Sequence, residues 1–362
     1  MPDSFSKPPL ACAVKLALTG GGTAGHVMPH IAMLPVFAKK GWEVIYIGSV
    51  GIERDLIAKT NVRFYTIAAG KLRRYFSVRN LIDVVKVLWG ILQALAILVR
   101  ERPNLVFSKG GFVSVPVAVA GFILKIPVVS HESDLTPGLA NKIISRFSNV
   151  ILTSFPETSR FVPKAKLVGI PIRHELTTGQ RDVGNRLCGF TGEENLQTIL
   201  VMGGSQGAQR INDALYEALP ELLAVYRIIH ITGKAKGRAF AHPRYKAFEF
   251  LSEELKDVLA AADFVVSRAG ANSIFELKAL AKPMLLVPLE VGSRGDQVDN
   301  AASFVKAGWA KVLRESELSP TSLKAAIEDL RQNGADLRAV LSKAASSDPA
   351  AAVAATLESF LA

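Results

Sequence analysis

A glycine-rich loop that ends in a histidine is the segment of this sequence best suited to chemistry. Residues 20–26 read GGGTAGH directly after the apolar run KLALT, and Gly20, Gly22 and Gly25 give the spacing G-x-G-x-x-G. Glycines between a strand and a helix permit positive φ and close backbone approach, and the N-terminus of the helix attracts anions. His26 is expected in the first helical turn, facing whatever the loop holds. The loop therefore predicts phosphate binding next to an imidazole.

A second loop repeats this pattern further along the chain. Residues 200–208 read LVMGGSQGA, so GG-[ST]-x-G occurs twice, each time between an apolar run and a helical pattern. One such loop is weak support, because tight strand-to-helix turns favour glycine in any case. Two related loops predict two related domains that each can hold phosphate.

A dinucleotide cofactor requires an acidic residue at the tip of the second strand, where it binds the ribose hydroxyls. That predicted strand, WEVIYIGS, ends in Gly48 and Ser49. Glu43 lies at its start, and Glu53 belongs to the next helix. A nicotinamide also has no use for an imidazole at residue 26. The sequence therefore argues against NAD.

The elements that must position these loops alternate between short apolar runs and helical patterns. VKLALT, WEVIYIG, VRFYTI, LVFS, IPVVS and NVILTS precede a polar stretch near residues 165–190, and QTILVM, YRIIHITG, FEFLS, DFVVS and PMLLVP follow it. Repeated βαβ units predict an α/β fold with two doubly wound, Rossmann-like domains. We expect an N-terminal domain over 1–170, a C-terminal domain over 171–345, and a C-terminal helix over 346–362 that packs back on the first domain.

Composition and charge narrow the class of protein further. The 362 residues include 43 Lys and Arg against 32 Asp and Glu, a net charge of +11, with 49% hydrophobic residues. This balance favours anionic partners in a globular protein. No nucleic-acid-binding module is recognisable, so nucleic acid is not expected. Two distant cysteines and no Asp-x-Asp motif argue against a disulfide framework and a metal site.

A long apolar helix is predicted over residues 81–99, with no signal peptide before it. Polar residues recur every three or four positions, among them Asp83, Lys86 and Gln93, so the helix is expected to lie on the N-terminal sheet rather than span a membrane. The preceding GKLRRYFSVRN alternates basic with aromatic residues, and Trp89 follows. That combination predicts peripheral contact with an anionic membrane surface.

Seven motifs, taken together and in order, resemble those of the MurG family of peptidoglycan N-acetylglucosaminyltransferases, which is glycosyltransferase family 28. They are GGGTAGHVMPHIA, KGGFVSVP, VVSHESDLTPGLANK, LVGIPIR, GGSQGAQRIN, SRAGANSIFELKALAKPMLLVP and SRGDQVDNA. The resemblance implies the GT-B architecture, with two domains facing across a cleft. It implies inverting transfer of N-acetylglucosamine from UDP-GlcNAc to the C4 hydroxyl of MurNAc in lipid I, which forms lipid II for peptidoglycan. It also implies action at the cytoplasmic face of the plasma membrane, without cofactor or metal, beside cell-wall synthesis and division proteins.

The resemblance also implies roles for individual residues. His26 is the candidate general base, because an imidazole titrates near the operating pH, although it could instead only bind a phosphate. Glu276 is expected to bind the uridine ribose, or alternatively to cap its own helix from Ser273-x-x-Glu276. The expected donor-binding residues are Thr23, Ala24, Gly25, Asp134, Arg173, Ser205, Leu251, Ala271, Asn272, Ser273, Ile274, Phe275, Glu276 and Gln297. The expected acceptor-binding residues are Gly22, Gly110, Gly111 and His131.

Three residues depart from the family pattern: Ala24 and Asp134 replace a common glycine and asparagine, and Ile170 replaces the asparagine of G-N-P-x-R. Ala24 is tolerable only if its φ is negative. The alternatives are another GT-B lipid or natural-product glycosyltransferase, and a UDP-GlcNAc 2-epimerase, which shares the nucleotide site but needs no basic, membrane-facing patch. A non-catalytic membrane adaptor would follow if His26 and Gln297 proved dispensable.

Overall fold

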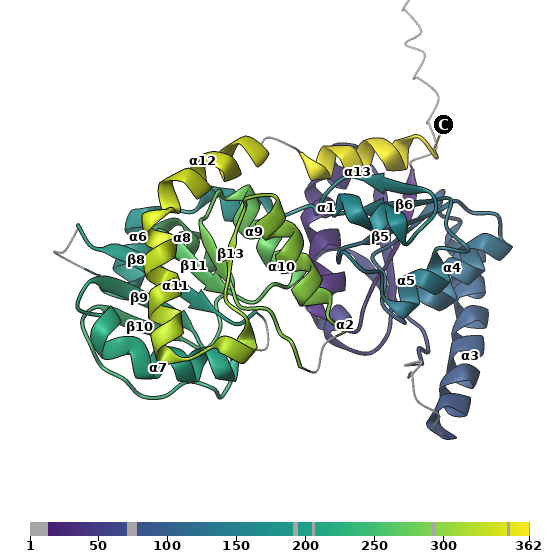
Figure 1. The fold of residues 1–362 in the computed structure, drawn as a ribbon. Helices are drawn as coiled ribbons and strands as arrows, with labels where there is room; N and C mark the ends of the chain where they lie inside the picture. Colours follow the sequence, from purple (N-terminus) through teal and green to yellow (C-terminus); the bar gives the residue numbers. More distant parts are fainter. Residues whose placement is uncertain are drawn as a thin grey trace, which may run out of the picture.

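The computed structural model describes residues 14–70, 78–190, 195–204, 207–291, 294–345 and 348–361. Its first half forms a parallel seven-stranded sheet in the order β3-β2-β1-β4-β5-β6-β7 (Figure 1). The strands are β1 Lys15–Thr19, β2 Glu43–Gly48, β3 Arg63–Thr66, β4 Leu105–Ser108, β5 Val128–Glu132, β6 Val150–Thr153 and β7 Ala165–Leu167. The central strands β4 and β5 are buried along their whole length, as expected of a parallel sheet covered by helices on both faces.

The second half forms a parallel six-stranded sheet in the order β10-β9-β8-β11-β12-β13. Its strands are β8 Gln197–Met202, β9 Tyr226–Ile231, β10 Tyr245–Phe248, β11 Phe264–Ser267, β12 Met284–Leu286 and β13 Lys311–Val312. In each sheet the first strand of the chain, β1 or β8, occupies the third position, and the strand order reverses between it and the neighbouring β4 or β11. The prediction of two doubly wound domains is therefore confirmed, and ligands are expected beyond the carboxyl ends of the strands at that reversal.

Helices cover both faces of each sheet (Figure 1). Around the first sheet lie a short 3-10 turn at Ala24–His26, α1 Met28–Lys39, α2 Ile52–Ile57, α3 Val78–Glu101, α4 Ser114–Ile123 and α5 Leu139–Ile144, with a further 3-10 turn at Pro156–Arg160. Around the second lie α6 Arg181–Cys188, α7 Gln209–Leu222, α8 Leu255–Ala261, α9 Ala271–Ala279, α10 Asp296–Lys306, α11 Pro320–Gln332, α12 Gly334–Ala344 and the 3-10 turns His174–Thr178 and Glu315–Glu317. The last helix is α13 Pro349–Glu358.

The two halves pack directly against each other. Phe155, which follows β6, is 1% exposed and contacts the rings of Phe275 on α9 and Phe304 on α10, with centroids 5.2 and 6.0 Å away. α12 packs on α9, whereas α13 crosses back to α1, where Val353 and Leu357 join the core of the first sheet (Figure 1). Aromatic and aliphatic burial thus holds the carboxyl edges of the two sheets in one arrangement.

The long helix α3 lies at the end of the first domain that points away from the second (Figure 1). Its inner face combines part of the polar stripe with apolar residues. Asp83 is buried, the Gln93 side-chain oxygen accepts from the Ala68 amide at 2.7 Å, and Ala94 and Leu98 join the core of the first domain, whereas Lys86 is exposed. Gly90 belongs to this inner face because a Cβ there would lie 2.2 Å from the Ala68 carbonyl oxygen. Other large apolar side chains of α3 point to solvent: Val84, Val85, Leu88, Trp89, Leu92 and Val99.

We call these six residues the outer face of α3. Their exposed fractions run from 42% to 59%. Within the described residues, no helix is both long enough and apolar enough to span a bilayer. The basic and aromatic stretch predicted next to this helix falls mostly in residues 71–77, outside the described part of the chain.

Candidate active site

The first glycine loop meets the second domain at the start of α9. The Asn272 side-chain nitrogen donates to the Gly25 carbonyl oxygen at 2.9 Å, and a Cβ on Gly25 would lie 3.0 Å from that nitrogen. Two segments assigned to the donor from sequence, although far apart in the chain, are thus in direct contact. Their meeting point lies beyond the carboxyl ends of β1 and β11, where doubly wound sheets bind ligands.

A narrow pocket lies beside this contact. It is lined by Met28, Pro29, Ile170, Pro171, Ile172, Arg173, Asn272 and Glu276. Inside it, an Arg173 guanidinium nitrogen lies 3.5 Å from a Glu276 carboxylate oxygen. Burial raises the pKa of Glu276, and the Arg173 charge partly opposes that shift. Ile170, one of the three departures, contributes an apolar wall here and is 2% exposed.

The capping alternative for Glu276 is wrong. α9 begins at Ala271 with Gly270 as its N-cap residue, and no side chain caps it. Glu276 therefore lies within the helix, one turn beyond its start, and its carboxylate contacts Arg173. The side chains of Ala271, Ile274 and Phe275 belong to the hydrophobic core, so these positions can reach a ligand only through their backbone atoms.

His26 lies in the 3-10 turn before α1, rather than in α1 itself, and is half-buried. Its Nδ1 lies 2.8 Å from the Gly21 carbonyl oxygen and 3.2 Å from the Thr23 hydroxyl. A carbonyl oxygen can only accept, so Nδ1 carries the hydrogen and the lone pair of the neutral ring is on Nε2. The ring is thereby oriented with Nε2 as its basic atom, which is the arrangement that a general base needs.

The pH dependence of catalysis should report this histidine. Burial lowers the pKa of His26 below its ordinary value of 6.5, and the nearby charges of Lys109 and Arg294 act in the same direction. A base must be unprotonated, so activity should fall as the pH drops through that lowered pKa. We expect the acidic limb of kcat/KM against pH to lie below pH 6.5. An acidic limb centred above pH 6.5 would contradict this assignment.

The loop after β4 approaches the first loop closely. Gly110 and Gly111 both have positive φ, at 87° and 82°, and a Cβ on Gly111 would lie 2.3 Å from the Gly21 carbonyl oxygen. The same Cβ would lie 3.1 Å from His26 Nδ1. The segment expected to bind the acceptor thus borders the histidine expected to deprotonate it.

Two expectations about the acceptor side change in the structure. The Gly22 amide already donates to the Glu53 carboxylate at 3.3 Å, so it is not available to bind an anionic ligand. His131 is fully buried, with Nε2 donating to the Gly169 carbonyl oxygen at 2.7 Å and Nδ1 against the Lys109 ammonium. Both ring nitrogens therefore have protein partners, so in this arrangement neither can form a direct hydrogen bond to a substrate.

Lys109 is a buried cation that the sequence analysis did not single out. It is 1% exposed and donates to the Ser133 hydroxyl at 2.6 Å as well as to His131. Burial lowers the pKa of Lys109, and burial raises the pKa of its neighbour Glu132. Glu132 in turn accepts from the Asn141 amide at 2.7 Å. This network fixes the loop after β5 against the glycine loop after β4.

Asn300 was missed as well, although it lies in the GDQVDNA motif one helical turn beyond Gln297. It is fully buried and bridges the domains, since its side-chain oxygen accepts from the Leu135 amide and its nitrogen donates to Asp134, both at 3.0 Å. Arg294 lies 3.7 Å from the Asp134 carboxylate. The charge that Asp134 adds at this position is therefore partnered across the domain boundary.

Three other described residues that are predicted to bind the donor do not line the pocket. The Gln297 side-chain oxygen accepts from the Leu289 amide at 3.0 Å, which orients its amide. Leu251 lies in the core of the second domain, consistent with a backbone contact only. Ala24 lies in the 3-10 turn and is not among the described residues with positive φ, so its methyl group is tolerated. Ser205 lies outside the described residues, between Gly204 and Gly207 with φ of 76° and 69°.

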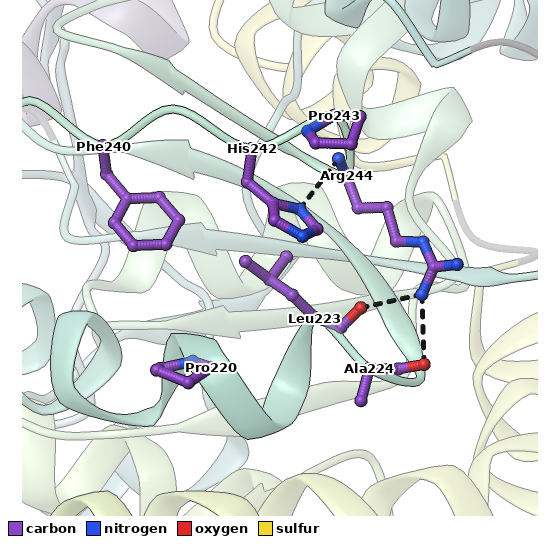
Figure 2. Close-up of a pocket in the computed structure, with 7 residues that line it drawn as sticks. All are labelled: Pro220, Leu223, Ala224, Phe240, His242, Pro243 and Arg244. Atoms are coloured by element: carbon purple, nitrogen blue, oxygen red, sulfur yellow. Dashed lines mark hydrogen bonds between the residues drawn. The ribbon is translucent and has the colours of Figure 1, made fainter.

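A larger hollow lies elsewhere, between the end of α7 and the segment before β10 (Figure 2). Arg244 closes one side of it by donating to the Leu223 and Ala224 carbonyl oxygens at 2.9 and 3.1 Å. β9 and β10 begin here, so the hollow is at the amino edge of the sheet, opposite the glycine loops. We do not assign the substrate to it. Over the described ranges, no group of three or more acidic, histidine or cysteine side chains is arranged to hold a metal ion.

Comparison with known proteins agrees with this geometry. The N-terminal domain model of glycosyltransferase family 28 matches residues 16–153, and its C-terminal domain model matches residues 198–357. A protein of Geobacillus thermodenitrificans is 50% identical over 92% of this chain and 96% of its own. One of Clostridium perfringens is 48% identical over 88% of this chain and 90% of its own. Both are named UDP-N-acetylglucosamine--N-acetylmuramyl-(pentapeptide) pyrophosphoryl-undecaprenol N-acetylglucosamine transferase.

Solved structures are similar over nearly the whole chain. Acinetobacter baumannii MurG superposes with a TM-score of 0.77 at 25% identity, over 96% of this chain and 99% of its own. The calicheamicin glycosyltransferase CalG4, at 15% identity and a TM-score of 0.67, shares the fold. The two sheets have the arrangement of the GT-B fold, and the family-28 domains together with the named relatives show a glycosyltransferase that uses a UDP-sugar. The chain belongs to glycosyltransferase family 28.

Proposed function

We propose that this enzyme transfers N-acetylglucosamine from UDP-GlcNAc to the C4 hydroxyl of MurNAc in undecaprenyl-diphospho-MurNAc-pentapeptide, with inversion at the anomeric carbon. The observation that carries the proposal is the contact between Asn272 and Gly25, which sets the oriented base His26 beside the pocket that holds Arg173 and Glu276. The names of relatives about 50% identical over most of the chain supply the substrates. They do not favour the epimerase.

The donor would bind mainly to the second domain. A carboxylate accepts two hydroxyl hydrogen bonds, so Glu276 suits the ribose, and Arg173 beside it suits the nucleotide. The glycine loop that precedes α7 would hold the diphosphate, because both Gly204 and Gly207 adopt positive φ and α7 presents its N-terminus beyond them. Gln297, with Asp134 across the domain boundary, would address the sugar hydroxyls.

Transfer would then follow from the placement of His26. The acceptor hydroxyl gives its proton to Nε2 as its oxygen attacks the anomeric carbon on the face opposite UDP. The bond from that carbon to the diphosphate breaks, and UDP leaves with the electron pair. Helix N-termini and Arg173 would stabilise the charge that develops on the leaving group. The loop with Gly110 and Gly111 borders His26 and would hold the acceptor diphosphate.

The acceptor is a polyprenyl lipid, and the outer face of α3 fits a protein that meets it at the bilayer. We propose that the chain is a peripheral protein on the cytoplasmic face of the membrane. Exposed apolar side chains on one helix, with Lys86 and Arg100 on the same helix, suit insertion at the headgroup level of an anionic membrane. Docking there would also bring the protein near wall-synthesis and division proteins.

The membrane proposal predicts the effect of a charged residue on this face. Trp89→Glu should weaken binding to phosphatidylglycerol vesicles about tenfold, because the half-exposed ring would no longer enter the interface and a like charge would meet the anionic surface. Val225→Glu is the matched control, since Val225 is 56% exposed on the second domain against 57% for Trp89. Sedimentation with vesicles measures both. Equal binding by the two variants would contradict the proposal.

One experiment separates the proposed transferase from the alternatives. The enzyme is incubated in chelator with labelled UDP-GlcNAc, either alone or with a short-chain lipid I analogue. We expect UDP release and label in the lipid only when the acceptor is present. Conversion of UDP-GlcNAc to an epimer without acceptor would favour the epimerase. Transfer to other lipids but never to the lipid I analogue would favour another GT-B glycosyltransferase.

A further inference from the structure

Glu53 is a buried carboxylate beneath the first glycine loop, and the proposed transfer gives it no role. It lies in the first turn of α2 and is 1% exposed. Its carboxylate accepts from the Gly22 amide at 3.3 Å, the Ser49 amide at 3.1 Å and the Ser49 hydroxyl at 2.5 Å. With three donors on its two oxygens, it acts purely as an acceptor, as the ionised form does.

The amide that Glu53 binds and the carbonyl that His26 binds belong to one peptide group. The Gly21 carbonyl oxygen accepts from His26 Nδ1 at 2.8 Å, and the Gly22 amide of the same peptide donates to Glu53. A negative charge at the N–H end of a peptide polarises it and makes its carbonyl oxygen a stronger acceptor, because hydrogen bonds in series reinforce one another. Glu53 and His26 are thus joined through a single peptide.

We propose that Glu53 is a positioning residue for the base His26, acting through the Gly21–Gly22 peptide. The inference rests on the proposed function, in which His26 Nε2 receives the proton of the acceptor hydroxyl. That transfer leaves an imidazolium, whose Nδ1–H then donates more strongly to the Gly21 carbonyl oxygen. The Glu53 carboxylate stabilises this charge across the peptide. The proton remains on Nε2 until solvent removes it.

The surrounding backbone is built to hold this peptide in place. A Cβ on Gly21 would lie 2.7 Å from a Glu53 oxygen, and one on Gly111 would lie 2.3 Å from the Gly21 carbonyl oxygen. Gly22 has a φ of 82°, a left-handed conformation that favours glycine. Glycines at 21 and 111 therefore permit both close approaches to the Gly21–Gly22 peptide.

The charged groups around His26 shift its pKa in opposite directions. Lys109 at the end of β4 and Arg294 before α10 lower the pKa of His26, whereas Glu53 on α2 and the hydrogen bond to Gly21 raise it. His30, one turn along α1, is buried, and burial lowers its pKa well below the ordinary value. Removing the negative charge of Glu53 would leave Lys109 and Arg294 unopposed. The imidazolium would then be less stable and Nε2 a weaker base.

The test is Glu53→Gln, which keeps the shape of the side chain and removes its charge. We expect kcat to fall about tenfold with KM for both substrates within about twofold, since only proton transfer is impaired. The acidic limb of the pH profile should move to lower pH. Titration of the histidine ring nitrogens by NMR should show the same downward shift of the His26 pKa, in protein without substrates.

Two further variants separate positioning from folding. Ser49→Ala removes one hydrogen bond to the same carboxylate but keeps its charge, and should leave the His26 pKa within experimental error. In a His26→Ala background, Glu53→Gln should have no further effect on transfer. An unchanged His26 pKa in Glu53→Gln, or an equal loss of activity with and without His26, would overturn the proposal. Because the NMR titration needs no transfer, a protein that shows the shift yet transfers no sugar would refute the proposed function alone.

Discussion

Replacing His26 by alanine should reduce kcat by about a hundredfold to ten-thousandfold, the range over which general bases contribute. The loss should fall on kcat, because the Arg173 and Glu276 pocket that would bind the donor is unaltered. Transfer of labelled sugar measures the rate, and calorimetric titration with UDP measures donor-site binding.

His242→Ala is the control for this substitution. His242 is exposed at the amino edge of the second sheet, beside the hollow in Figure 2 and far from the glycine loops. It should transfer sugar at the wild-type rate. A His26→Ala enzyme that retains most of its kcat would show that His26 only binds a phosphate and that another group accepts the proton.

Replacing Glu276 by glutamine should raise KM for UDP-GlcNAc about tenfold to a hundredfold and change kcat much less. The substitution removes a charge-assisted hydrogen bond to the ribose and leaves the Arg173 guanidinium in the pocket without its ion pair. Steady-state kinetics at saturating acceptor measures the change. Glu217→Gln on the exposed face of α7 is the matched control and should behave as wild type.

A donor with 2′-deoxyribose tests whether the ribose is the partner of Glu276. Wild type should lose affinity for this donor, whereas Glu276→Gln should discriminate much less between the two donors. The two changes share one interaction, so their effects should not add. Full additivity would show that Glu276 acts on the pocket through Arg173 and does not touch the ribose.

The fold could be predicted from the sequence because its signals are local and repeated. Apolar runs such as VKLALT and QTILVM, each followed by a glycine loop and a helical pattern, specify βαβ units one at a time, which is enough to predict two doubly wound domains. The pairing of Gly25 with Asn272 could be anticipated only as a consequence of two such domains facing each other. The boundary near residue 170 stays a prediction.

The residues that sequence reasoning missed act through long-range contacts. Asn300 gains its role from Leu135 and Asp134, and Lys109 gains its role from His131, in both cases across elements that no local pattern connects. The sequence places Glu53 in the helix after the second strand, which argues against a ribose ligand and indicates no other role. Its burial beneath the first loop becomes visible only once α2 is packed against β2.

The helix α3 illustrates a different limit. Its periodicity predicted an amphipathic helix correctly, but not which face turns inward. Gly90 and Gln93 face the protein because the backbone near Ala68 offers a hydrogen bond and demands a small side chain. Ala94 and Leu98 pack inward beside them, while the larger apolar residues of the outer face stay exposed, where hydrophobicity alone would not have placed them.

The configuration of the new glycosidic bond tests the central claim most directly. The account predicts that the lipid-linked product formed from α-linked UDP-GlcNAc carries a β bond to the C4 oxygen of MurNAc, because His26 activates that hydroxyl on the face opposite UDP. NMR of the purified product, formed in chelator, gives both the anomeric configuration and the point of attachment. A β1→4 linkage is the predicted result. An α linkage, or attachment at any other oxygen, would contradict direct displacement at the site described here.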